Sequence, residues 1–358
     1  MAYRGQDRNN FGISENRSFL LNGYIIGEQR IKKLYLKWIL GTTIVLLMPI
    51  GQFYRCFLTF YYPEYGSISR NVNYISMLLN LTITLTQAII IFRLNWDYFW
   101  SYIDSLELLN IPSYDKLRKQ IQRKRIVKIF MFASILLIYK APEFIYTPWH
   151  YNRFTIIFHL ARYVGHFFIF IILIDICICL QAAFESVNKQ IVSCCYNNKQ
   201  RLLLKHLLYY RQCWFHALEA TQSAEKFLRH YVTFFYVRFA VHTVLNQIHL
   251  FHHLKSSQFS DVFYFLIVTF TNAILVWYIT ANMIAVNTFS QNSLEELYEL
   301  TFKTDSIILE QQIYMFLDQI SKTDAGFTFG NLFLIAPNFI TSFFTLTLTI
   351  TIAFLSYL

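Results

Sequence analysis

The chain has 358 residues, of which 55% are hydrophobic and only 15% are charged, whereas ordinary soluble domains carry about 25% charged residues. Several apolar runs reach the roughly 20 residues that cross a bilayer, so the composition excludes an ordinary soluble globular protein. The net charge of +10 does not indicate nucleic-acid binding, because the Lys and Arg residues lie between apolar runs, as topology signals do. We therefore expect an integral membrane protein.

Seven windows are apolar enough to cross a bilayer as helices, which predicts an all-α, polytopic bundle over residues 36–358, preceded by an N-terminal segment, 1–35. The fifth window is the most polar, because Arg238, His242 and Asn246 interrupt it and charged groups are costly in lipid. We keep it because the rest of that window is Phe, Tyr, Val and Leu. The predicted spans lie near 36–60, 72–92, 127–147, 154–182, 229–251, 262–286 and 332–357.

The distribution of basic residues predicts the orientation of this bundle. Of the 31 Lys and Arg residues, 24 fall before the first span or in alternate loops on one side, and 5 fall on the other. The positive-inside rule then places the N-terminus in the cytosol and, with seven spans, the C-terminus outside the cell. The N-terminal segment has no short apolar region followed by a small-residue cleavage site, so we expect no cleaved signal peptide.

Two cytosolic stretches are predicted to be helical, Leu202–Leu228 and a segment near 306–323. In the second, Ile313, Leu317 and Ile320 share one face at helical spacing, and such a face needs a partner to cover it. We expect the inner ends of spans four, five and six to extend into the cytosol and pack with this anchor helix at a subunit interface. Helices lying on the membrane surface are the alternative.

No enzyme chemistry, metal or cofactor is expected from the motifs. The sequence contains no G-x-S-x-G, H-E-x-x-H, Walker or G-x-G-x-x-G motif. Cys194 and Cys195 are adjacent rather than spaced as zinc ligands, and free cytosolic thiols are the simpler interpretation. His249, His252 and His253 lack accompanying Cys or carboxylate ligands except Asp261, which disfavours a metal site.

Polar residues form one stripe along span four and another along span five, which the heptad-like spacing places on single helical faces. Facing stripes would line a water-filled ligand pocket in the outer half of the bundle, because ionisable groups in a span avoid lipid. The alternative is hydrogen bonding between helices, with Asp175 or another acid pairing to Arg162 or Arg238. The candidate ligand-binding residues are His159, Arg162, His166, His242, Asn246, His249, Tyr146 and Tyr264, with Trp149 and Tyr278 as further aromatic walls.

The last span contains Thr and Ser among Phe, Leu and Ile, and its local alternation resembles a strand. A lone strand cannot satisfy its backbone in lipid, so we expect a helix with a hydroxyl-lined side. This side is a candidate wall of an ion path with an apolar constriction that gates by dewetting. Hydroxyls that bond back to the helix's own carbonyls are the alternative. The candidate pore residues are Thr341, Thr345, Thr349, Ile352 and Leu355, with Ser356 on the same side.

The stretch from Ala325 to Phe344 resembles the C-terminal pattern of the insect gustatory receptor family, within the gustatory and odorant receptor superfamily. The pattern comprises a small-residue turn, paired aromatics, paired leucines and a Thr-Tyr opening. The family's Thr-Tyr, five hydrophobics, Gln-Phe signature aligns near Thr341-Ser342 and Leu348-Thr349, where Thr341 agrees. The other matching residues are Phe327, Phe329, Leu332 and Phe333.

The resemblance implies a tetrameric, ligand-gated, non-selective cation channel. Its last helix would line the pore, its cytosolic helices would anchor a homo- or heterotetramer, and its ligand pocket would lie among the outer halves of spans two to six. The implied setting is the plasma membrane of sensory neurons, among membrane lipids, and the implied ligand is a small-molecule tastant, with no nucleic-acid partner. Two alternatives stay open: a divergent receptor-like relative without channel activity, and a protein resembling a G-protein-coupled receptor.

Overall fold

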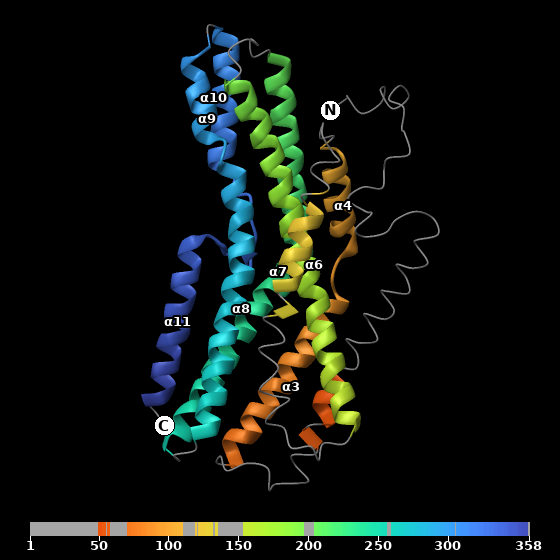
Figure 1. Cartoon of the computed structure of the whole chain (residues 1–358), viewed down its shortest axis with the longest axis vertical. Helices are drawn as coiled ribbons and strands as arrows, with labels where there is room; N and C mark the ends of the chain where they lie inside the picture. The colour runs from red at the N-terminus through yellow and green to blue at the C-terminus, as the bar shows by residue number, and fades with distance from the viewer. Residues whose placement is uncertain are drawn as a thin grey trace, which may run out of the picture.

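Three long helices, α6 (Arg153–Tyr196), α7 (Leu204–Lys255) and α8 (Phe259–Gln291), run along most of an elongated bundle (Figure 1). Their lengths of 44, 52 and 33 residues exceed the roughly 20 residues of a membrane span. Each therefore continues past its predicted apolar window at one end. The computed structural model describes residues 49–54, 56–57, 70–109, 119, 121–131, 133–134, 153–196, 204–255, 259–304 and 306–356.

Helix α3 (Arg70–Phe92) is followed directly by the short helix α4 (Trp96–Glu107), and the two are bent by 55°. The bend has a local cause, since the Asn95 side chain caps α4 by accepting a hydrogen bond from Asp97 N at 3.0 Å. The apolar residues of α4 recur at helical spacing and are buried against α7. These buried residues include Phe99, Tyr102, Ile103 and Leu106.

The short helices α9 (Leu294–Phe302) and α10 (Ile307–Lys322) gather at one end of the bundle (Figure 1). Helix α10 occupies the stretch expected to form an anchor helix. Its apolar face packs into the junction of α7 and α8. At this junction the buried Trp214 indole donates to Ser290 O at 3.1 Å and packs against Phe316, with ring centroids 6.0 Å apart. Burying a large apolar side chain contributes about 1.5 to 3 kcal/mol, so this contact anchors the end of the bundle.

A tight hairpin connects α10 to the last helix. Strands β1 (Thr328–Phe329) and β2 (Phe333–Leu334) pair antiparallel around Gly330 and Asn331, each of which has φ of 62°. Helix α11 (Pro337–Ser356) follows at once. The last span was expected from about residue 332, but its helix begins at Pro337 because the hairpin occupies the preceding residues, where proline then opens the helix with a preset φ.

Two helical segments in the described ranges are long and apolar enough to cross a membrane, Ile169–Ser193 and Phe265–Phe302. A third joins them if Met77–Phe92 and Trp96–Glu107 form one bent span, and Pro337–Ala353 is apolar but shorter. The C-terminal part of α7 does not qualify, which is consistent with its polar stripe. The windows near 36–60 and 127–147 lie largely outside the described residues, so the count of seven spans stays a prediction.

Candidate functional site

The hydroxyl-bearing stretch at the end of the chain is helical. Thr347 and Thr351 are 3% and 1% exposed on its packed face, whereas Thr341, Thr345 and Thr349 are exposed. At about 100° per residue, side chains two positions apart point in nearly opposite directions. The predicted hydroxyl stripe therefore faces away from the rest of this chain. The exposed Ile352 shares that side, while the Leu355 side chain lies outside the described residues.

Several hydroxyls of α11 donate to carbonyls of their own helix. Thr341 Oγ1 donates to Asn338 O, and Thr349 Oγ1 donates to Thr345 O, each at 2.9 Å. Thr347 and Thr351 make the same bond on the packed face. A hydroxyl has one hydrogen and two lone pairs, so a back-bonded hydroxyl still presents an acceptor. The intrahelical bonding weighed as an alternative thus occurs together with an exposed stripe.

An aromatic cluster fixes the first turns of α11 to α7. The buried Tyr236 ring lies 4.9 Å from the Phe339 ring and 5.1 Å from the Phe343 ring, measured between centroids. Phe329 of the hairpin joins the cluster at 6.1 Å from Tyr236. Edge-to-face aromatic pairs contribute about 0.5 to 1.5 kcal/mol beyond their buried area. The start of α11 is thus firmly held, which leaves its outward stripe in a defined direction.

The polar stripe of α7 lies on half-buried positions of that helix. Arg238 Nη1 donates to Gln87 Oε1 of α3 at 2.8 Å, and the His249 ring stacks on Phe265 of α8 at 5.3 Å. His242 and Asn246 are also half-buried between them. The stripe therefore contacts the neighbouring helices α3 and α8, as a pocket wall or a helix–helix contact would.

The partner stripe is described only by its backbone. His159, Arg162 and His166 lie in the first part of α6, at the same end of the bundle as the last part of α7 (Figure 1). Their side chains and that of Tyr264 in α8 lie outside the described residues, as do Tyr146 and Trp149. The facing of the two stripes stays a prediction.

Tyr278, expected as an aromatic wall of the outer pocket, is buried in the bundle. It is 8% exposed, and its hydroxyl donates to Lys128 O at 3.0 Å. Its polar end thus joins α8 to the helical segment 121–131, and its role as a pocket wall stays a prediction. A tyrosine in an apolar span has the same appearance in the sequence whether it lines a cavity or joins two helices.

A buried polar network joins residues 121–131 to α6 and α8, and sequence reasoning missed it. The Nε and Nη2 nitrogens of the Arg125 guanidinium both donate to the carboxylate of the buried Asp175. Lys128 Nζ donates to Gln181 Oε1 at 3.1 Å and to Asn282 Oδ1 at 2.5 Å. Asp175 was weighed as a partner of Arg162 or Arg238, but it is engaged by Arg125.

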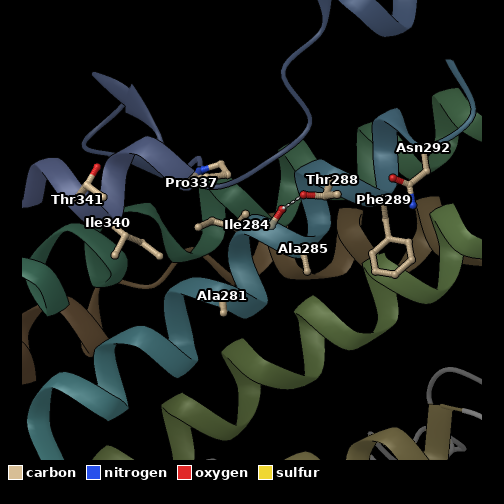
Figure 2. A pocket seen from close by; sticks show the side chains of 9 residues that line it. All are labelled: Ala281, Ile284, Ala285, Thr288, Phe289, Asn292, Pro337, Ile340 and Thr341. Carbon is tan, nitrogen blue, oxygen red and sulfur yellow. Dashed lines mark hydrogen bonds between the residues drawn. The ribbon is translucent and has the colours of Figure 1, made fainter. Parts of the chain in front are cut away.

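A mostly apolar hollow of about 500 Å³ lies between α8 and the start of α11. Figure 2 shows the side chains that line it. Thr288 on its rim donates to Ile284 O at 3.2 Å. Small residues at i and i+4 of α8, Ala281 and Ala285, open the space, and this spacing is the sequence signal that was available. The lining residues are Ala281, Ile284, Ala285, Thr288, Phe289, Asn292, Pro337, Ile340 and Thr341.

Metal binding has no support among the described residues, which contain no group of three or more His, Cys, Asp or Glu side chains placed to hold an ion. Of the cysteines that the structure describes, Cys56, Cys177, Cys179 and Cys213 are buried.

No protein-family profile matches the sequence, and no curated protein matches it. Solved structures do match the fold, including two of the same receptor. The insect olfactory receptor OR5 from Machilis hrabei aligns with a TM-score of 0.61 at 10% identity, covering 93% of this chain and 90% of that one. The same receptor in complex with eugenol aligns with a TM-score of 0.64 at 10% identity, covering 93% of both chains. The chain therefore has the fold of an insect olfactory receptor.

Proposed function

We propose that this protein is a chemosensory receptor of the gustatory type that acts as a ligand-gated, non-selective cation channel. In this proposal it is a seven-span protein of the plasma membrane of sensory neurons, with a cytosolic N-terminus and an extracellular C-terminus. The observation that supports channel activity is that the hydroxyl stripe of α11 faces away from the rest of the chain. A helix surrounded by lipid gains nothing from a Thr face, whereas a helix beside an aqueous path does.

One copy of α11 cannot enclose a path, so the channel requires an oligomer, and we propose a homo- or heterotetramer. Large apolar side chains on α9 and α10 support it, because they are exposed in the single chain and an exposed apolar patch is typical of an interface. Phe302, Ile307 and Ile308 are 74%, 82% and 65% exposed. Subunits that pack through these helices would surround a central axis on which the four α11 stripes converge.

Ile352 and Leu355 are the proposed constriction of this path. They follow the Thr positions on the same side of α11, and apolar side chains at a narrow point stop ions by excluding water. Thr341, Thr345 and Thr349 would line the wider part with acceptor oxygens.

The proposed ligand site lies in the outer half of the bundle, between the polar stripes of α6 and α7, with His242, Asn246 and His249 on the α7 side. Its ligand is a small-molecule tastant. The fold shared with a receptor solved in complex with eugenol supports a small-molecule site, and half-buried polar groups among aromatic side chains are typical of such pockets.

Whole-cell recording from cells that express this chain alone tests the proposal, with G-protein signalling blocked and a tastant panel applied. Epitope tags first establish the sides of both termini. A ligand-evoked cation current is expected. A response that disappears with G-protein signalling would favour the receptor coupled to G proteins, and surface-expressed protein without current in any subunit combination would favour a receptor-like protein without channel activity.

A further inference from the structure

The hairpin between α10 and α11 is attached to the middle of α7 by side-chain hydrogen bonds. Its turn is tight, since both Gly330 and Asn331 have φ of 62°, a conformation that residues with a Cβ rarely adopt. Thr328 Oγ1 accepts from Asn331 N at 3.2 Å, which closes the turn. We therefore treat the hairpin as one compact, rigid unit.

Two contacts join this unit to α7. Thr328 Oγ1 donates to Glu225 Oε1, and Gly330 N donates to Thr233 Oγ1 at 2.8 Å. Positions 225, 229 and 233 recur every four residues, so they share one face of α7. The hairpin lies along that face.

The Glu225 carboxylate is oriented before the hairpin reaches it. The residue is 6% exposed, and Arg229 Nε and Nη2 donate to its two oxygens at 2.8 and 2.6 Å. A bidentate guanidinium fixes the plane of a carboxylate. An ionised carboxylate only accepts hydrogen bonds, so Thr328 has to be the donor. Hydrogen bonds to a charged group are roughly twice as strong as those between neutral groups.

The base of the hairpin is seated against α8 without spare room. A Cβ added to Gly326 would lie 3.0 Å from Leu334 Cδ1 and 3.4 Å from Asn287 Cβ. Phe327 and Ile335 at the two ends are 1% and 0% exposed, and Ile335 N donates to Phe327 O at 2.9 Å. Apolar packing thus holds the base, while Glu225 and Thr233 hold the turn.

We infer that Glu225 is a positioning residue for gating: through Thr328 it sets the orientation of α11 relative to the cytosolic helices. This inference rests on the proposed channel function. Helix α7 carries both the candidate ligand residues of its outer half and the Glu225 contact, so a displacement of α7 on ligand binding reaches α11 through the hairpin. A rigid element whose position both sites bias is the physical basis of coupling between them.

A distance measurement tests the positioning in the full-length protein without any ligand. Spin labels are introduced at the exposed positions Ile308 in α10 and Ile350 in α11 by unnatural amino acids. We expect Thr328→Val and Glu225→Gln each to broaden the distance distribution between the labels, and the double variant to broaden it no further. Thr328→Ser keeps the hydroxyl and is expected to leave the distribution as in the parent protein.

The matched control is Thr221→Val. Thr221 is a buried threonine one turn before Glu225 whose hydroxyl donates to Ala217 O within α7 at 2.8 Å. Its variant removes from the same helix a buried hydroxyl whose hydrogen bond stays within α7 and does not join the hairpin. Unchanged distributions in Thr328→Val and Glu225→Gln, or broadening in Thr221→Val of the same size, would overturn the positioning role.

The second readout is the ligand-free open probability of single channels in planar bilayers. Thr328→Val is expected to change it by about fivefold or more, the lower end of typical coupling between sites, while single-channel conductance stays constant. A constant open probability with a broadened distance distribution would overturn the gating role. Protein without any current would defeat the proposed channel instead, and the distance measurement would still decide the positioning.

Discussion

The Tyr236 hydroxyl of α7 lies 2.7 Å from Thr280 Oγ1 of α8, and both side chains are buried. Thr280 Oγ1 donates to Val276 O within its own helix, so its single hydrogen is used and Tyr236 has to be the donor between the helices. The ring of the same tyrosine carries the aromatic cluster that holds α11. One side chain therefore joins α7, α8 and α11.

Replacing Tyr236 by Phe keeps the ring and removes this hydrogen bond. We expect a loss of stability of about 0.5 to 1.5 kcal/mol, the usual net contribution of one such bond, with α11 still in place. Thermal unfolding in detergent measures it. The pair Tyr236→Phe and Thr280→Val forms a double-mutant cycle, and strictly additive losses would contradict a direct contact.

A bulky residue on the α11 stripe should obstruct ions. Thr345→Trp or Thr349→Trp is expected to lower single-channel conductance severalfold while surface density stays constant, because the side chain enters the proposed path. Ile350→Trp is the matched control, since Ile350 is exposed on α11 but lies off the stripe. Equal conductance in all three variants would remove the pore assignment.

Smaller side chains at the proposed constriction should have the opposite effect. Ile352→Ala widens an apolar ring and weakens its exclusion of water, so we expect a larger ligand-free current. The control is Leu346→Ala, an exposed apolar residue of the same helix that lies off the stripe. Recording of basal current in cells that express each variant at equal surface density provides the comparison.

Removing one partner of the buried pair of Arg125 and Asp175 is expected to lower the stability of the protein. Asp175→Asn leaves a guanidinium inside the bundle without its counter-charge, and losing one partner of a buried pair costs about 3 to 5 kcal/mol. We expect reduced surface expression and a lower Tm in detergent. The double variant Arg125→Met with Asp175→Leu should recover much of the loss, because no charge stays buried. A double variant as unstable as Asp175→Asn would contradict this account.

Variants of two residues in the polar stripe of α7 distinguish a ligand contact from a contact between helices. His242→Ala is expected to shift the half-maximal ligand concentration at unchanged expression if the stripe lines a pocket. Arg238→Ala should instead lower expression, because Arg238 donates to Gln87 and its loss removes a hydrogen bond from a buried amide. Dose–response curves normalised to surface protein distinguish the two. Lost expression in both variants would favour a purely structural stripe.

The sequence was informative where a residue's environment is dictated by local spacing. The face of α10 that carries Ile313 and Ile320, and the helical state of the residues from Thr345 to Ile352, both follow from periodicity and from the physics of lipid. The Arg125 pair with Asp175 was not predictable, because its partners are 50 residues apart and several acids were equally plausible. The hydrogen bond from Thr328 to Glu225 was missed for the same reason, since it connects residues 103 positions apart.

The hydroxyls of α11 that donate to their own helix also determine which ion charge the proposed path would favour. Thr341 and Thr349 spend their only hydrogen on their own helix, so what they turn outward is lone-pair density. Water beside such a surface points its hydrogens at it, and a metal cation can exchange part of its hydration shell for these oxygens. At these two positions an anion would find no donor to replace the water it leaves behind. Thr341 and Thr349 would thus favour cations over chloride in a helix that has no charged residue.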